Sequence, residues 1–412
     1  MKVLLINIEH SYGGGANTVY LNIGEMLRRH GVGVVFFALH STNELRCEQS
    51  SFFGKGISQE NPISYLYNRF YNRDAAISLQ RLIDAEHPDV ASIHLMFGGL
   101  APSILKVLKQ NKIPIVHTVH DYAMICSKVT LRGAQGEICE KCKGGDYFQG
   151  VISKCHHGSF VRSLLATLEI QYHNKRYHPT HYIDHFLFVS HFCANKHEEM
   201  DCRFTDVSKS VLYNVPDERV VKLARETVLD TYRGYYLYYG RLSYEKGLHT
   251  LIKAFVERPQ LKLKIVGTGP LEQQLKDYCR DLGSKNIEFL GFKTGYDLYR
   301  IVQEAKFVCV PSEWYENNPM TIIESYTLST PVIAARIGGI PEIVNDKETG
   351  FLFNPGQVDD LLKVLDASVS LLESDYCVMK RVAADFSSLT FDRKNYIDRI
   401  LNIFKRVIND NQ

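Results

Sequence analysis

Residues 3–16 read VLLINIEHSYGGGA, an apolar run followed by polar residues and by three consecutive glycines. The apolar run predicts a buried β-strand over residues 3–8, because a short stretch of this composition suits the interior of a parallel sheet. A helix is predicted over residues 17–30, where Gly31 ends a helical repeat of apolar side chains, namely Val19, Ile23, Met26 and Leu27. A strand, a glycine turn and a helix in this order open a parallel α/β sheet.

The same alternation of strand and helix runs through the rest of the chain. In the first half we expect a helix at residues 102–110 and strands at 32–39, 88–95, 113–119 and 186–190, with residues 186–190 as the last strand. In the second half we expect helices at residues 247–256 and 271–282 and strands at 235–239, 261–266, 307–311, 331–335 and 350–353. This pattern predicts the α/β class with two parallel sheets.

The length of 412 residues exceeds what one ordinary core organises, so we expect two domains. Pro216 and a charged stretch interrupt the apolar pattern, which places the junction near residues 214–217. We therefore predict domains at 1–214 and 215–391, and a last helix within 392–412 that packs back on the first domain. Two such domains in series bind their ligand at the carboxyl ends of their strands.

Composition excludes some classes of function. The chain is 45% hydrophobic and 23% charged with a formal net charge of +2, which is typical of a globular protein and argues against nucleic acid as a partner. No run approaches the ~18 apolar residues of a membrane span, and the short N-terminal run has no cleavage site after it. We expect a cytoplasmic protein, in which the ten cysteines are reduced or bound to metal.

The strongest local motif is PSEWYENNPMTIIE, at residues 311–324. A strand ends there and a helix begins, with Asn318 predicted as the N-cap and Pro319 as the first helical residue. The unpaired amides of the first turn would suit a diphosphate or sugar hydroxyls. Glu316 precedes the helix and Glu324 follows about five residues into it. These carboxylates suit a grip on hydroxyls, although alone they equally fit one solvated and one paired glutamate.

Two loops of the second half suit a phosphate. Residues 240–247, GRLSYEKG, place Arg241 and Lys246 between a strand and a helix, where cations would stabilise a departing pyrophosphate. A solvated basic turn is the alternative interpretation. In residues 267–270, GTGP, the absence of a side chain at Gly267 lets the backbone approach a nucleotide closely.

The glycines at residues 13–15 do not form a dinucleotide fingerprint. Gly13 and Gly15 match its spacing, but Thr18 replaces the third small residue, and the second strand ends without an acid. A glycine cradle for a phosphate or an acceptor fits better than NAD, and tight-turn glycines without a ligand remain the alternative.

A third motif, HTVHDY at residues 117–122, ends a strand of the first half. His120 is placed to hydrogen-bond a sugar hydroxyl, and Asp121 to orient that histidine or the acceptor. A structural role for His120 is equally compatible with this position.

Taken together, these segments resemble the retaining glycosyltransferases of family 4, which have the GT-B fold. The similarity covers nearly the whole chain and follows its order: GGGA, HPDVASIH, HTVHDY, FVSHF, LYNVPD, YYGRLSYEKGLHTLIKAF, IVGTGP, residues 311–324, and PVIAARIGGIPEIV. The resemblance implies two Rossmann-like domains that face a central cleft, and a sugar transfer from a nucleotide-diphosphate donor.

The resemblance also implies roles for residues of this chain. Arg241 and Lys246 would bind the donor diphosphate, Glu324 the ribose, and Glu316 would lie beside the donor sugar. His120 would contact that sugar near the reaction centre, which makes the implied catalytic set His120, Glu316, Arg241 and Lys246. Further donor contacts would come from Gly14, Gly15, Gly267, Asn318, Pro319, Met320 and Thr321, and acceptor-side contacts from Asp121 and Tyr122.

Members of this family usually need no divalent metal, and retention is thought to proceed by front-face attack. The resemblance implies a hexose-type donor with UDP or GDP and a sugar or lipid-linked acceptor in surface polysaccharide or glycan assembly. Two alternatives stay open: a sugar-nucleotide epimerase of the same fold, and a non-catalytic nucleotide-sugar-binding protein.

Four cysteines form a separate pattern, Cys126-x12-Cys139-x2-Cys142-x12-Cys155, which we treat as an insertion at residues 126–155. Four thiolates at such spacing suit a closed structural zinc site, with His156 or His157 as a substitute for Cys155. Four reduced thiols, or a redox pair, are the alternatives.

Residues 156–181 mix basic side chains with apolar ones, and residues 65–73 have a similar character. Arg162, Lys175 and Arg176 accompany Phe160 and several leucines, so this helix would suit the surface of an anionic bilayer. Such peripheral contact at the inner face of the cytoplasmic membrane would fit a lipid-linked acceptor. A helix packed on one face and solvated on the other is the alternative.

Overall fold

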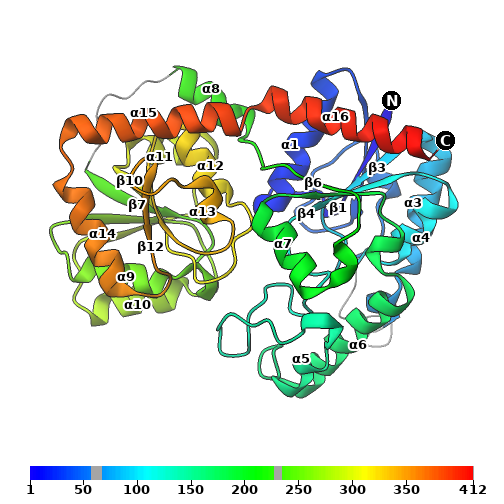
Figure 1. Cartoon of the computed structure of the whole chain (residues 1–412), viewed down its shortest axis with the longest axis horizontal. Coiled ribbons are helices and arrows are strands. Elements are labelled where there is room, and N and C mark those ends of the chain that lie inside the picture. The colour runs from blue at the N-terminus through cyan, green and yellow to red at the C-terminus, as the bar shows by residue number, and fades with distance from the viewer. Residues whose placement is uncertain (57–66, 227–233, 412) are drawn as a thin grey trace. The chain divides into compact units, whose positions relative to one another are not determined.

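The computed structural model describes residues 1–56, 67–226 and 234–411 (Figure 1). The chain divides into two compact units. Unit 1 consists of Met1–Leu212 and Lys394–Gln412, and unit 2 of Tyr213–Arg393. Of the stretch at 65–73 that we singled out, Tyr65 and Leu66 lie outside the described residues.

Unit 1 is built on a six-stranded parallel sheet with the order β2-β1-β3-β4-β5-β6. Its strands are β1 (Lys2–Glu9), β2 (Gly33–Leu39), β3 (Val90–Ile93), β4 (Ile115–Val119), β5 (His185–Phe188) and β6 (Lys209–Val211). The central strands are apolar along their length because helices cover both faces, and the side chains from Val3 to Ile6 are fully buried.

Three helices of unit 1 begin at a residue whose side chain caps them. Asn72, Ser159 and Ser190 each accept a hydrogen bond from an amide of the first turn that follows them. The α-helices are α1 (Gly15–Arg29), α3 (Arg73–Glu86), α4 (Ser103–Gln110), α5 (Gln149–Ile152), α6 (Phe160–Arg176) and α7 (His191–Met200). The 3-10 turns are η1 (Ser50–Phe52), η2 (Lys143–Gly145), η3 (Pro179–His181) and η4 (Cys202–Phe204).

The expectation that residues 186–190 form the last strand of this half was wrong. The strand stops at Phe188 because Ser190 caps α7, with its Oγ accepting from the amide of Cys193 at 3.1 Å. A further edge strand, β6, pairs with β5. At three residues it is too short to give an apolar pattern in the sequence.

Unit 2 contains a second six-stranded parallel sheet with the order β12-β11-β10-β7-β8-β9. Its strands are β7 (Tyr235–Tyr239), β8 (Lys262–Val266), β9 (Ile287–Gly291), β10 (Phe307–Val310), β11 (Val332–Ala335) and β12 (Gly350–Phe353). The edge strand β9 was not expected, because its burial is incomplete and its sequence alternates weakly. The α/β class with two parallel sheets is confirmed.

The helices of unit 2 lie between these strands. They are α8 (Glu218–Glu226), η5 (Tyr244–Lys246), α9 (Leu248–Val256), α10 (Glu272–Asp281), α11 (Gly295–Glu304), α12 (Met320–Thr327), α13 (Ile340–Ile343), α14 (Val358–Ser370) and α15 (Glu373–Thr390).

The last helix, α16 (Arg393–Asp410), belongs almost entirely to unit 1. Arg406 Nη2 lies 3.0 Å from His185 Nδ1 on β5, and Arg399 donates to the carbonyl of Val211 on β6 at 2.9 Å. Within the described part of the chain, no helix has the length and apolarity needed to cross a membrane.

Candidate functional site

Three loops of unit 2 leave the carboxyl ends of adjacent strands, since β10, β7 and β8 are neighbours in the sheet. The loop after β7 carries Arg241 and Lys246, the loop after β8 begins at Gly267, and the loop after β10 carries Glu316. A β-carbon on Gly267 would lie 1.9 Å from the carbonyl oxygen of Gly240. Gly267 is therefore required for two of these loops to pack together, whether or not it also approaches a ligand.

The loops after β7 and β10 are also locked to each other. A β-carbon on Gly247 would lie 1.9 Å from the carbonyl oxygen of Pro311, and the amide of Glu313 donates to the carbonyl of Glu245 at 2.8 Å. Any side chain at position 247 would push these loops apart. The backbone thus holds Lys246 and Glu316 close together although 70 residues separate them.

Lys246 and Glu316 form an ion pair, with Nζ 2.6 Å from Oε1. Ser312 Oγ also donates to Oε1, at 2.7 Å. Burial by itself would raise the pKa of Glu316, but Lys246, Ser312 and Trp314 outweigh it and lower that pKa below its ordinary value. The site therefore holds a carboxylate at neutral pH. Arg241, on the same loop as Lys246, is exposed.

Glu324 is the fifth of the eight residues of α12, and its carboxyl group is in a different electrostatic environment from that of Glu316. Tyr239 OH donates to its Oε2 at 3.2 Å. Burial raises the pKa of Glu324 to about 7, with the Tyr239 hydrogen bond opposing that shift and Asp217 adding to it. Near neutral pH this carboxyl group is thus divided between its acid and its anion.

The prediction that Asn318 caps α12 and that Pro319 is its first helical residue was wrong. Pro319 has ψ of 119° and is itself the residue before the helix, which begins at Met320 without a side-chain cap. Asn318 Oδ1 instead accepts from the amide of Asn214 at 2.8 Å. Among the described residues, Asn318 Nδ2 has no hydrogen-bond partner although the side chain is only 6% exposed. An unpaired donor therefore lies beside an uncapped helix N-terminus.

In unit 1, β1, β3 and β4 are neighbours, so the segments that follow them share one edge of the sheet. α1 begins at Gly15, and the preceding Gly14 has φ of 83° and makes no side-chain cap. A β-carbon on Gly14 would meet nothing within 4 Å. The space beside Gly14 is therefore open, which leaves room for a phosphate or an acceptor to approach its backbone.

His120 has a partner that the sequence interpretation missed. His94, just after β3, places Nδ1 at 2.9 Å from His120 Nε2, and the two rings stack at 5.2 Å. Burial lowers the pKa of His120 to about 3, with His117 contributing, and burial also lowers the pKa of His94. Both rings are neutral at physiological pH, so one nitrogen donates and the other accepts. The sequence could have indicated this pair, because His94 and His120 each lie at the end of a predicted strand and the two strands lie side by side in the sheet.

The two acceptor-side candidates differ in exposure. Asp121 Oδ1 accepts from the amide of Ala123 at 2.9 Å, and burial raises the pKa of Asp121 to about 6. Tyr122 is 1% exposed and its ring stacks on His197 at 5.8 Å. In this structure the phenol ring of Tyr122 packs in the core of unit 1.

The four cysteines of the insertion meet around one small pocket of ≈ 20 Å³. Cys126, Cys139, Cys142 and Cys155 line it, and all four are free thiols. Burial and the neighbouring thiols raise the pKa of Cys142 to about 12. Among the described residues, no three His, Cys, Asp or Glu side chains already stand in an arrangement that would hold a metal ion.

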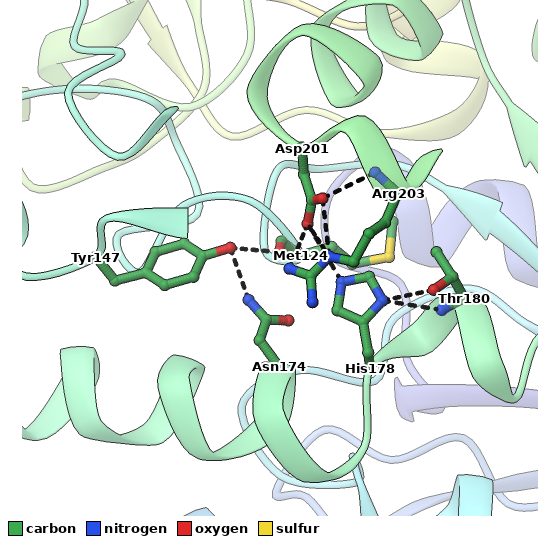
Figure 2. A network of polar contacts seen from close by, with 7 residues as sticks. All are labelled: Met124, Tyr147, Asn174, His178, Thr180, Asp201 and Arg203. Carbon is green, nitrogen blue, oxygen red and sulfur yellow. Dashed lines mark hydrogen bonds and ion pairs between the residues drawn. The ribbon is translucent and has the colours of Figure 1, made fainter. Parts of the chain in front are cut away.

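A polar network fastens this insertion to the rest of unit 1 (Figure 2). Tyr147 OH accepts from Asn174 Nδ2 on α6 at 2.6 Å and lies 3.4 Å from the carbonyl of Met124. Beside them, Arg203 Nη2 donates to Asp201 Oδ2 at 2.6 Å, and His178 Nε2 lies 3.3 Å from that oxygen. The contacts of Tyr147 join the insertion to α6, and those of Asp201 join the C-terminal end of α7 to the segment that follows α6.

Each of the two units matches a known family of proteins. Residues 13–208 match the family model "Glycosyltransferase Family 4", and residues 222–375 match "Glycosyl transferases group 1". The chain belongs to the family 4 glycosyltransferases, and the expected GT-B fold is confirmed.

Similar proteins include an uncharacterized glycosyltransferase of Methanocaldococcus jannaschii, 24% identical over 88% of this chain and 86% of that protein. The O-antigen chain mannosyltransferase C of Escherichia coli is 28% identical over 47% of this chain and 51% of its own length. In two further curated relatives, the matched region spans 35% and 25% of the relative's length.

Two solved structures illustrate the shared fold. HepE of Anabaena in complex with UDP is 17% identical, with a TM-score of 0.63, over 98% of this chain and 100% of that one. Sucrose-phosphate synthase of Thermosynechococcus elongatus is 16% identical, with a TM-score of 0.68, over 99% of each chain.

Proposed function

We propose that this chain is a retaining glycosyltransferase that moves a hexose-type sugar from a UDP- or GDP-sugar to a sugar or lipid-linked acceptor. The observation that carries the proposal is the set of groups at the carboxyl ends of β7 and β10 and the start of α12: Arg241, Lys246, Glu316, Asn318 and Glu324. Cations, carboxyl groups and an unpaired amide donor at the carboxyl ends of neighbouring strands provide the chemistry that a sugar nucleotide needs. HepE was solved with UDP and with UDP-glucose, which supports this donor class.

In this proposal Arg241 and Lys246 take the diphosphate, and its arrival draws Lys246 toward phosphate and away from Glu316. Glu316, a carboxylate beside the donor sugar, then accepts from sugar hydroxyls. Glu324 accepts from the ribose hydroxyls, while the Asn318 amide group and the first-turn amides of Met320 and Thr321 donate to phosphate and sugar. Pro319 has no N–H and adds only contact.

Unit 1 supplies the other half of the proposed reaction. Gly14 and Gly15 would close over the phosphate, and His120, held by His94, would contact the donor sugar near the reaction centre. Asp121 would orient the acceptor. Positive side chains and helix N-termini, with no divalent metal, would stabilise the leaving diphosphate.

Two alternatives predict different products. A sugar-nucleotide epimerase would change the donor without an acceptor, and a non-catalytic binding protein would bind the donor without turnover.

The proposal also includes a setting for the enzyme. It would act in the cytoplasm or at the inner face of the membrane, in surface polysaccharide or glycan assembly.

The test starts with a thermal-shift screen against UDP, GDP, ADP and their common sugar conjugates, because a ligand of the native state raises the melting temperature. The Glu324→Ala variant should lose most of the shift, and Glu373→Ala, on an acidic surface position of α15, should keep it. The anomeric configuration of the transferred sugar, read by NMR, then tests retention. A full shift in Glu324→Ala, or an inverted product, would contradict the proposal.

A further inference from the structure

Helix α6 presents its apolar side chains outward. Its buried residues are small or polar for the most part: Ser163, Ala166, Thr167, Ile170 and His173. Its outer side carries Val161, 63% exposed, and Leu168, 42% exposed, with Leu164, Leu165 and Tyr172 half-buried between and beyond them. The first four of these positions recur at helical spacing and form one stripe, which ends at Tyr172, whose ring packs on Phe70 at 5.6 Å.

The inner face of α6 is fixed, so the helix cannot roll to hide this stripe. Thr167 Oγ1 donates to the carbonyl of Tyr147 at 3.1 Å, and Ser163 Oγ accepts from the amide of His156 at 3.1 Å. A β-carbon on Gly150 of α5 would lie 3.3 Å from Thr167 Oγ1, so small residues are needed where α5 and α6 meet. Buried hydroxyls with partners hold the orientation.

Further exposed apolar side chains lie on and beside the short helix α5, which packs against α6. Phe148 and Ile152, four residues apart, are 51% and 70% exposed, and Phe160 at the start of α6 is 55% exposed. Single exposed apolar side chains are ordinary, but five within residues 148–168 are not. We call Phe148, Ile152, Phe160, Val161 and Leu168 the α5–α6 patch. In Figure 1, α5 and α6 extend beyond the sheet of unit 1.

The charge near the patch is mostly positive. Between residues 146 and 183 the chain has four basic side chains, Lys154, Arg162, Lys175 and Arg176, and two acidic side chains, Asp146 and Glu169. Glu169 is already paired, because Arg69 Nε donates to its Oε2 at 2.7 Å. All four basic side chains are exposed. An apolar surface with an excess of exposed basic side chains close to it in the sequence matches the headgroup region of an anionic bilayer.

We propose that the α5–α6 patch docks unit 1 on an anionic lipid bilayer, with the apolar side chains in the interfacial layer and the basic side chains at the headgroups. The inference gives a specific surface to the membrane setting proposed above, but it does not rest on the transferase activity, because partition onto lipid needs neither donor nor acceptor. It also explains why apolar side chains here point outward, which costs stability in water. An acceptor carried on a lipid would meet the enzyme at this surface.

The test is co-sedimentation of the full chain with vesicles. We expect binding to phosphatidylcholine vesicles that contain about 30% phosphatidylglycerol, and little binding to pure phosphatidylcholine. Raising the salt from about 0.1 M to about 0.5 M should weaken the binding several-fold, because the charge contribution is screened. Equal binding to neutral and anionic vesicles, or none to either, would overturn the proposal.

Variants locate the binding surface. Phe160→Ser with Val161→Ser should weaken vesicle binding by at least about tenfold. Phe292→Ser, at a side chain of unit 2 that is 69% exposed, is the matched control and should bind as the native chain does. Arg162→Glu should also weaken binding, whereas Arg381→Glu on α15 should not. Melting temperatures show that all variants fold.

A protein partner would give a different result. If the native chain is a dimer in light scattering and the double variant is a monomer, the patch is an interface between copies and the proposal is wrong. Unchanged vesicle binding in the double variant would also contradict it. Because this assay contains no nucleotide sugar, its outcome is independent of whether the proposed transferase activity is found.

Discussion

At the scale of single residues, the candidate donor site contains an ion pair, Lys246 with Glu316, for which a bound ligand would compete. Lys246 and Glu316 neutralise each other in the absence of a ligand, with Nζ and Oε1 2.6 Å apart, and Glu316 is 6% exposed. A donor diphosphate would compete with Glu316 for the same ammonium group. Donor binding and the stability of the fold would therefore both depend on the ammonium group of Lys246. Substitutions of Lys246 or Glu316 must be tested for their effect on each.

We predict that Lys246→Ala destabilises the folded chain by about 3 kcal/mol, because it leaves a buried carboxylate without its cation. The double variant Lys246→Ala with Glu316→Gln should recover most of that loss, since it removes the stranded charge, yet it should stay inactive. Denaturant unfolding of both variants, beside turnover measurements, checks this. Equal stability of Lys246→Ala and the native chain would show that the pair contributes nothing.

Glu324 should make donor binding depend on pH. Because burial raises its pKa to about 7, its anion fraction falls as the pH drops through 7. If the anion binds the ribose, affinity for the nucleotide sugar should fall by up to about tenfold between about pH 8 and about pH 6.

The raised pKa of Glu324 also determines the direction in which the stability of the fold changes with pH. A carboxyl group whose pKa is higher in the folded chain than in the unfolded chain favours folding at low pH and loses that contribution as the pH rises through about 7. Glu324→Gln should abolish both dependences, in calorimetric titrations and in melting curves. An unchanged pH profile in this variant would assign the titration to another group.

At the scale of elements, the cysteine insertion has little regular structure of its own. Between Cys126 and Cys155 it contains only η2 and α5, and the non-glycine residues Val129, Leu131 and Lys154 have positive φ. Such backbone conformations persist only where other contacts impose them. Burial raises the pKa of Cys126 above its ordinary value, and the amides of Leu131 and Lys128 oppose that rise only in part, so the sulfur is a thiol at neutral pH in the absence of a metal.

We propose that these four cysteines bind a structural zinc ion, which would draw the sulfur atoms inward from their present arrangement. Purified chain should contain about one zinc per molecule, and chelation should lower the melting temperature. Cys139→Ser should lose the metal, while Cys377→Ser, an exposed thiol on α15, should retain it. Metal well below one equivalent, with no response to chelator, would leave four reduced thiols as the answer.

The sequence was sufficient to predict the strands and helices whose formation depends on residues close together in the chain. The apolar runs of β1, β7 and β12 and the repeat of α1 were predicted because their periodicity is local. Partners far apart in the chain were not: His94 with His120, Lys246 with Glu316, and Asn318 with Asn214 all depend on which strands lie together. The strands β6 and β9 were missed because both are only partly buried and therefore need no apolar run, unlike the buried edge strand β12.

At the scale of the whole molecule, unit 1 is discontinuous and depends on α16. This helix buries six apolar side chains: Tyr396, Ile397, Ile400, Ile403, Phe404 and Val407. At about 1.5–3 kcal/mol for each side chain, their burial contributes on the order of 10 kcal/mol as an upper estimate. That is comparable to the whole stability of a typical domain, ~5–15 kcal/mol.

Deleting residues 394–412 should therefore unfold unit 1 while unit 2, which is continuous, keeps its own melting transition. Calorimetry of the truncated chain should show one transition in place of two, and proteolysis should remove unit 1 first. Two intact transitions after the deletion would mean that α16 adds little to unit 1.

The placement of α16 also sets an order of events during synthesis. Residues 213–393 leave the ribosome as one continuous stretch and have everything that unit 2 needs to fold. Unit 1 starts first but must wait for residues 394–412, which are made after all of unit 2. During that interval the surface that α16 will cover, on β5 and β6, is exposed to chaperones and to other nascent chains.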